Sequence, residues 1–267
     1  MRACRIIAAL LALWLSATLA HAQDVEVDLE LVLMVDVSRS MSEGELELQR
    51  RGYAEALASE DVFRAVQSGL LQTIALTYVE WAGTQEIVVD WRLIRSRRDL
   101  QDFSRLLTLR FDPTLRRTSI SNALLFGADR IAANNFHGLR RVIDISGDGP
   151  NNLGPHVVDS RDAVLARGIT INGLPLMTDE GSFAGFHLDN LDVYYRSCVT
   201  GGTGSFVIPV YDWPDFADAV RRKLVLEIAG LLDGPRIWQI QSVRDPSDCW
   251  VGEKIWEDFQ RNRFMIP

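Results

Sequence analysis

The sequence lacks the short motifs of several common catalytic sites. It has no Gly-x-Ser-x-Gly motif of a serine hydrolase, and its glycine-rich stretch at Gly201–Phe206 contains no lysine to hold a phosphate. Histidine is scarce, and the three histidines that follow position 22 are scattered without the spacing of zinc ligands. These absences argue against a serine hydrolase, a P-loop nucleotide hydrolase and a zinc enzyme.

Long apolar runs are also few, and the one that stands out lies at the N-terminus. Arg2 and Arg5 precede the run Ile6–Ala17, and Ala20-His21-Ala22 fits the small-x-small cleavage pattern. The run is too short for a membrane helix, although an uncleaved anchor is the alternative. We therefore expect residues 1–22 to be a cleaved signal peptide, a periplasmic or secreted location, and no transmembrane segment in the mature chain.

Positive charge is in deficit as well. Without the expected leader the chain has 26 basic and 36 acidic residues, a formal net charge of −10. Because nucleic acids are bound largely by neutralising their phosphates, this charge argues against a nucleic-acid partner. An acidic protein can still bind an acidic partner, and a bridging cation is one way to join the two.

Cysteine is nearly absent from the mature chain, which retains Cys198 and Cys249. Export permits a disulfide between them, and two buried thiols are the alternative. A disulfide would close a loop of about 50 residues and stabilise the fold by roughly 3–4 kcal/mol in the chain-entropy model. It would also attach the C-terminal part of the chain to the main domain.

The chain does contain a regular alternation of short apolar runs and longer amphipathic stretches, with no fixed-period repeat. Strands are predicted at Leu29–Val35, Leu71–Trp81, Glu86–Ile94, Arg141–Ser146, Ile169–Leu174 and Ser205–Val210. Helices are predicted at Gly44–Ser59, Asp61–Gln67, Arg98–Leu107, Ser119–Ala133, Val157–Arg167, Leu188–Val199 and Asp215–Leu232. The alternation predicts a three-layer α/β/α sandwich with a mostly parallel sheet. Gly83-Thr84 indicates a hairpin and thus one antiparallel edge strand.

A boundary signal follows the last predicted helix, at Gly234-Pro235. The part beyond it carries three tryptophans and Cys249, which is too aromatic for a disordered tail. We expect a leader at residues 1–22, the α/β domain at residues 25–232, and a C-terminal segment at residues 233–267 that packs on the domain.

Three oxygen-rich clusters lie where a predicted strand ends or a predicted helix begins: Asp36–Ser40, Arg117–Ser121 and Ser146–Asn152. In open α/β sheets, ligands bind beyond the carboxyl ends of the strands. None of the clusters contains histidine or cysteine, and hard oxygen donors suit Mg²⁺, Mn²⁺ or Ca²⁺ better than zinc. The sequence therefore predicts a divalent-cation site at this edge.

Simpler structural roles are available for the same residues. The serines could cap a helix, but Ser42 with Glu45 three residues later already predicts a capping box. Thr118 could be a helix N-cap and Asp148-Gly149 a plain turn. Each of these roles explains one cluster by itself and leaves the coincidence of the three clusters unexplained.

These elements resemble the metal-ion-dependent adhesion site (MIDAS) of the von Willebrand factor type A superfamily, which has an Asp-x-Ser-x-Ser motif, a distant Thr and a distant Asp-Gly. Asp36, Ser38 and Ser40 match the first, Thr118 in RRTSISNAL the second, and Asp148 the third. The resemblance spans Val27 to Leu232. YVEWAG, RRVIDISGDGPNN, ITINGLPL and YYRSCVTGG further resemble an uncharacterised group of secreted bacterial proteins with this fold, a domain of unknown function.

The resemblance implies a function. Ser38, Ser40 and Thr118 would coordinate Mg²⁺ (or Mn²⁺ or Ca²⁺) directly, and Asp36 and Asp148 directly or through water. A carboxylate of a protein partner would fill the open position, so the chain would be an exported, non-catalytic binding module. Arg116-Arg117 replaces the family's small residues before the Thr, and this pair would either recruit an anionic partner or lie on the surface.

Two alternatives remain open at this point. A metal-dependent hydrolase would need a base near the cation, and none is evident. A structural periplasmic component would keep the fold without a working metal site. Glu80 and Asp144, inside predicted buried strands, are either a catalytic pair or carboxylates paired with an Arg or backbone donors.

Overall fold

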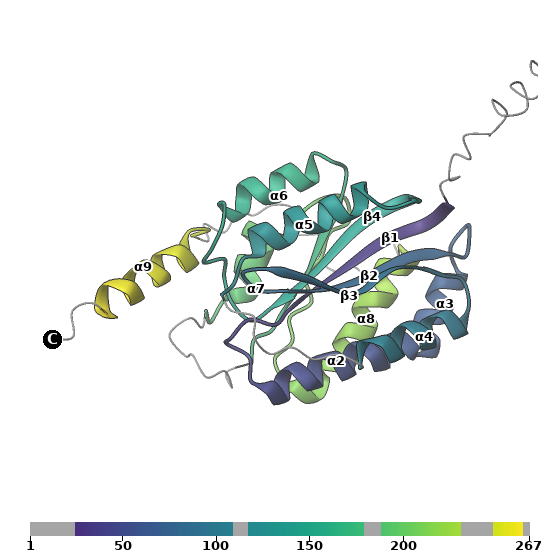
Figure 1. The fold of residues 1–267 in the computed structure, drawn as a ribbon, viewed down its shortest axis with the longest axis horizontal. Coiled ribbons are helices and arrows are strands. Elements are labelled where there is room, and N and C mark those ends of the chain that lie inside the picture. The colour runs from purple at the N-terminus through teal and green to yellow at the C-terminus, as the bar shows by residue number, and fades with distance from the viewer. Residues whose placement is uncertain (1–24, 109–116, 179–187, 231–247, 264–267) are drawn as a thin grey trace, which may run out of the picture.

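The structure, a computed structural model, describes residues 25–108, 117–178, 188–230 and 248–263 (Figure 1). The expected signal peptide, residues 1–22, lies outside these ranges.

A five-stranded sheet has the order β3-β2-β1-β4-β5. Its strands are β1 (Val25–Asp36), β2 (Ile74–Trp81), β3 (Gln85–Ile94), β4 (Phe136–Gly147) and β5 (Thr170–Pro175). Strand β3 pairs antiparallel with β2 at one edge and the other pairs are parallel, which confirms the predicted fold class.

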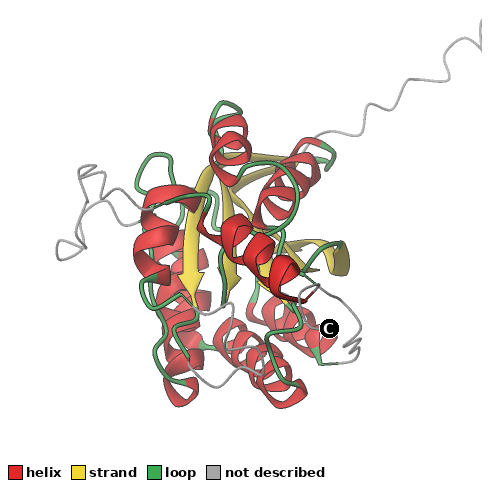
Figure 2. Cartoon of the chain, turned by 90° about the vertical axis from the view of Figure 1, so that its left-hand side faces the viewer, coloured by secondary structure: helices red, strands yellow, loops and turns green. Residues whose placement is uncertain are grey.

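Helices cover both faces of the sheet, as Figures 1 and 2 show. One face carries α2 (Glu43–Ala58), α3 (Glu60–Gln67), α4 (Arg97–Leu107) and α8 (Phe216–Ala229). The other face carries α5 (Ile120–Ala132), α6 (Val157–Leu165), α7 (Leu191–Tyr194) and a π-helical turn (Tyr195–Val199). Helix α9 (Val251–Arg263) follows Cys249. No helix within the described ranges has the length and apolarity needed to cross a membrane.

Strand β1 is the centre of the sheet and is buried on both faces. Leu31 and Leu33 belong to the core under α2 and α8, and Val32 and Met34 belong to the core under α5. This explains why residues 31–35 form an uninterrupted apolar run, since a strand covered on both faces has no solvent side. The loop after Asp36 therefore starts from a rigid strand end.

Two predicted elements differ from the structure in type, while β1 and β4 begin earlier and β2 begins later than predicted. Ser205–Val210 forms isolated bridges beside β5, at Val207 and Val210, instead of a full strand. Pro209 lies between these bridges and has no N–H to donate to a ladder. The helix predicted at Leu188–Val199 is a single α-turn that continues as the π-helical turn.

Candidate metal centre

The predicted site lies at the carboxyl ends of the parallel strands β1, β2 and β4. In the sheet register Asp36 pairs with Trp81, and Val35 pairs with Ser146. The loops that follow these strands consequently begin side by side at one edge of the sheet. The N–H of Val37 donates to the carbonyl of Trp81 at 2.9 Å, which continues the sheet by one residue into the first loop.

Two of the predicted clusters meet through a chain of oxygen atoms. The Ser38 and Ser40 hydroxyls are 3.0 Å apart, and the Ser40 hydroxyl donates to Asp148 Oδ1 at 2.8 Å. The Ser38 N–H donates to Asp36 Oδ1 at 2.7 Å. Residues separated by 108 positions in sequence thus form one group of oxygens, with Asp36 and Ser38 buried and Ser40 and Asp148 partly exposed.

Asp36 is the most constrained member of this group. It is fully buried, and its Oδ2 has no hydrogen-bond partner among the residues that the structure describes. Burial raises the pKa of Asp36 well above its ordinary value and the nearby charge of Asp148 adds to this, while hydrogen bonds from Ser38 oppose it. A buried carboxylate with an unpartnered oxygen beside a second carboxylate is stabilised by a positive charge, so this donor set fits a hard divalent cation.

Thr118 belongs to the neighbouring loop, just before α5. Its N–H donates to Asn152 Oδ1 at 3.2 Å, and the Asn152 N–H donates to the Thr118 carbonyl at 3.0 Å. Thr118 is buried, and the loop is also held to the end of β2 because the Ser119 N–H donates to the Ala82 carbonyl at 3.1 Å. The loop that carries Thr118 is therefore joined to the loop that carries Asp148.

The helix-capping alternatives for these residues are not what the structure shows. Ser42 and Glu45 form the predicted capping box of α2, which leaves Ser38 and Ser40 without that role. The N-cap of α5 is Ser119, whose side chain accepts from the Asn122 N–H, so the N-cap interpretation of Thr118 is wrong.

Sequence reasoning gave no role to Asn151, although it lies within the third cluster. It is completely buried, and its Oδ1 accepts from the Ser121 N–H at 3.0 Å. Its own N–H donates to the Tyr194 hydroxyl at 3.2 Å. Asn151 therefore joins the loop of Asp148 to α5 and α7.

The candidate metal centre is not a cluster of acidic side chains. Within the described ranges, no group of three or more His, Cys, Asp or Glu side chains is placed to hold a metal ion. The donors at the strand ends are two carboxylates and serine hydroxyls, with Thr118 on the adjoining loop. Any ion bound here would have to rely on hydroxyl ligands.

Comparison with known families decides where the chain belongs. The profile of a family described as "Protein of unknown function (DUF1194)" matches residues 26–232. The chain belongs to the DUF1194 family. A comparison with the curated proteins found no match for this DUF1194 chain.

Solved structures show the fold of the DUF1194 domain. Proximal thread matrix protein 1 (PTMP1) from the mussel byssus matches with a TM-score of 0.57 and 13% identity, over 77% of this chain and 49% of PTMP1. The pilus adhesin SpaC from Lactobacillus rhamnosus GG matches with a TM-score of 0.54 and 13% identity, over 76% of this chain and 31% of SpaC. The chain thus spans about half of PTMP1 and about a third of SpaC. The DUF1194 domain has the von Willebrand factor type A fold, as the sequence resemblance predicted.

The two buried strand carboxylates of the DUF1194 domain each have a basic partner. Arg50 on α2 donates to both oxygens of Glu80, at 2.6 Å each. Lys223 on α8 forms ion pairs with Asp144 and with Glu227 on its own helix. Of the two interpretations of Glu80 and Asp144, the structure therefore shows structural pairing.

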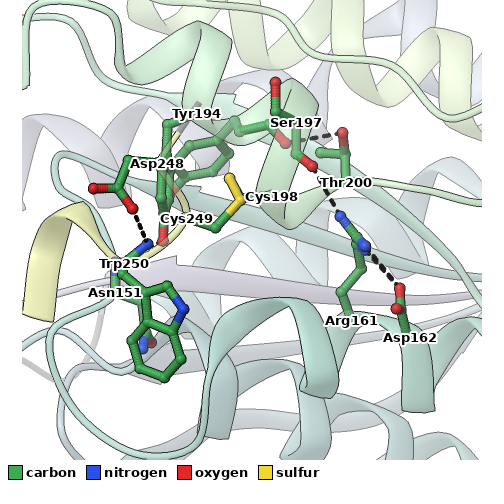
Figure 3. The surroundings of a disulfide bond; sticks show 11 residues. Asn151, Arg161, Asp162, Tyr194, Ser197, Cys198, Thr200, Asp248, Cys249 and Trp250 are labelled. Atoms are coloured by element: carbon green, nitrogen blue, oxygen red, sulfur yellow. Dashed lines mark hydrogen bonds and ion pairs between the residues drawn. A yellow bond between two sulfur atoms is a disulfide. The ribbon is translucent and has the colours of Figure 1, made fainter. Parts of the chain in front are cut away.

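Arg117 and the cysteines are also placed by the structure, whereas Arg116 lies outside the described ranges. Arg117 is exposed, and its guanidinium lies 4.6 Å from the centroid of the Trp256 ring. Its φ of 71° is unusual for a residue other than glycine. Cys198 and Cys249 form a disulfide with Cα atoms 5.6 Å apart (Figure 3).

Proposed function

We propose that this DUF1194 chain is an exported, non-catalytic binding module that captures a protein partner through a divalent cation, Mg²⁺ or else Mn²⁺ or Ca²⁺. Asp36, Ser38, Ser40, Thr118 and Asp148 would hold the cation. The observation that carries the proposal is the buried, unpartnered Oδ2 of Asp36 beside the row of serine hydroxyls and Asp148. Export rests on the leader expected at residues 1–22.

The donor set favours binding of an external anion over catalysis. Hydroxyl ligands carry no charge, so the two aspartates would be the only anionic groups at the centre. An aspartate that holds the ion through water would leave its charge incompletely neutralised, and a ligand carboxylate would then be attracted to the open position. Glu80 and Asp144, the other buried acids considered as catalytic groups, are each engaged by a basic side chain. Neither is therefore a ready general base for a hydrolytic reaction.

Structural neighbours support a binding role. One PTMP1 structure, with a TM-score of 0.54 to this chain, has a zinc-occupied MIDAS motif, and SpaC is a pilus adhesin. These are properties of those proteins, and at 13% identity the likeness to this chain is one of fold. The proposal for this chain rests on its own oxygen donors.

Partner capture tests the proposal. Tagged mature protein is incubated with periplasmic extract of its source in MgCl₂ or in chelator, and the retained proteins are identified by mass spectrometry. We expect the same partner to be retained with Mg²⁺, released by chelator, and not retained by Ser38→Ala. Ser104→Ala is the matched control. Ser104 is also buried, but its hydroxyl donates a hydrogen bond to the Leu100 carbonyl within α4, away from the candidate centre. Retention that is unchanged by chelator and by Ser38→Ala would contradict the proposal.

A further inference from the structure

The start of the C-terminal part of the chain, residues 248–256, packs against the loop that carries Asp148. We call these residues the 248–256 segment. Cys249 attaches it to Cys198 in the π-helical turn, and Figure 3 shows Asn151 and Trp250 close to this disulfide. The Trp250 ring stacks on His156, with centroids 4.0 Å apart and an angle of 17° between the planes. The segment is thus held at two points before α9 extends away from the domain (Figure 1).

Gly252 packs directly against the backbone of Asn151. A Cβ atom at position 252 would lie 2.0 Å from the Asn151 carbonyl oxygen, a distance that non-bonded atoms cannot adopt. One residue further, Glu253 Oε1 accepts a hydrogen bond from Asn151 Nδ2 at 2.8 Å. The backbone and the side chain of Asn151 are therefore both in contact with the 248–256 segment.

Asn151 transmits this contact toward the candidate metal centre. It lies three residues after Asp148, and its Oδ1 accepts from the Ser121 N–H in the first turn of α5. The next residue, Asn152, forms hydrogen bonds with both the N–H and the carbonyl of Thr118. A displacement of Asn151 would therefore move the loops of Asp148 and Thr118 together.

A second contact reaches the same loops from further along α9. Arg117, which directly precedes Thr118, places its guanidinium over the Trp256 ring. Arg117 also has a left-handed backbone conformation, which is sparsely populated for residues with a side chain. The 248–256 segment consequently contacts both loops that contribute residues to the centre.

We propose that the 248–256 segment sets the affinity of the candidate centre for its ion, with Asn151 as the positioning residue between them. This inference rests on the proposed function. Groups behind metal ligands hold the ligands in their binding orientation, and their loss typically lowers metal affinity 10- to 100-fold. Asn151 belongs to the loop of Asp148 and contacts the segment, so separation of the loop from the segment removes that support.

The test compares glycine variants in the full mature chain by titration calorimetry with Mn²⁺. Gly252→Ala introduces the methyl group that cannot fit against Asn151, and we expect it to weaken Mn²⁺ binding about 10-fold. Gly44→Ala in α2 is the matched control because a Cβ there meets no atom within 4 Å. Hydrogen exchange at residues 148–152 should rise in Gly252→Ala only.

A second pair of variants keeps the test informative if Gly252→Ala does not fold. Glu253→Ala removes the acceptor for Asn151 Nδ2 and should also weaken Mn²⁺ binding, whereas Glu257→Ala, at an exposed position one turn later, should not. Wild-type affinity in Glu253→Ala and in any folded Gly252→Ala overturns this inference alone. Absence of Mn²⁺ binding by the wild-type chain overturns the proposed ion site, and this inference with it.

Discussion

The buried group around Lys223 makes the stability of this domain depend on pH in a defined direction. Lys223, one of the two lysines of the chain, is buried with Asp144 and Glu227, and Asn172 Nδ2 donates to Glu227 Oε1 at 2.9 Å. One cation therefore faces two carboxylates. Burial, and next the charge of Asp144, raise the pKa of Glu227 from 4.5 to about 7, while Lys223 and Asn172 oppose the rise.

The sign and size of the effect follow from this pKa. Between the unfolded pKa of 4.5 and the folded pKa of about 7, the unfolded chain loses its Glu227 proton and the folded chain keeps it, so stability falls as pH rises. Each pKa unit corresponds to about 1.4 kcal/mol. Because Glu227 is buried, the full shift applies and corresponds to about 3 kcal/mol, of which about 2–3 kcal/mol lies between pH 5 and pH 8.

Glu227→Gln removes this titration while it keeps the side-chain shape. We expect the variant to gain about 2–3 kcal/mol relative to wild type when the pH is raised from 5 to 8. Urea unfolding at both pH values, followed by circular dichroism, measures the difference. Glu47→Gln, at an exposed position of α2, is the control and should show no such gain. A Glu227→Gln difference that stays constant from pH 5 to pH 8 would refute the reasoning.

Two further predictions concern the disulfide and the pairing of Glu80. The double variant Cys198→Ser with Cys249→Ser should lose about 4 kcal/mol of unfolding free energy in the chain-entropy model for a separation of 51 residues; a loss below about 1 kcal/mol in urea unfolding would contradict that. Arg50→Met should cost about 3–5 kcal/mol, because it leaves the Glu80 carboxylate buried without its bidentate partner. Glu80→Gln in the Arg50→Met background should recover part of this loss, and thermal unfolding that shows no recovery would count against the ion pair as the cause.

Much of the fold could be predicted because its signals are local. The apolar run of β1 and the Ser42–Glu45 capping box depend on neighbouring residues, and both appear in the structure where the sequence predicted them. The strand predicted at Ser205–Val210 was wrong in extent because Pro209 removes a ladder donor, a signal that was present in the sequence but outweighed by the apolar neighbours.

The parts that were missed depend on pairings between distant segments. Lys223 and Glu227 are spaced as i and i+4 on a helix, which usually indicates an exposed pair, and only the position of Asp144 under α8 explains their burial. Asn151 acquires its role from contacts with Tyr194 and Glu253, which lie 43 and 102 residues away. Neither role has a local signal in the sequence.

The central claim is that the oxygens at the ends of β1 and β4, with Thr118, hold a divalent cation. Crystals of the mature protein soaked in MnCl₂ and measured for anomalous scattering at the manganese edge test it most directly. We predict one strong peak within coordination distance of the Ser38 and Ser40 hydroxyls. Thr118, Asp36 and Asp148 should contact the same ion directly or through water. No peak at this position, with Mn²⁺ bound elsewhere or not at all, would contradict the account.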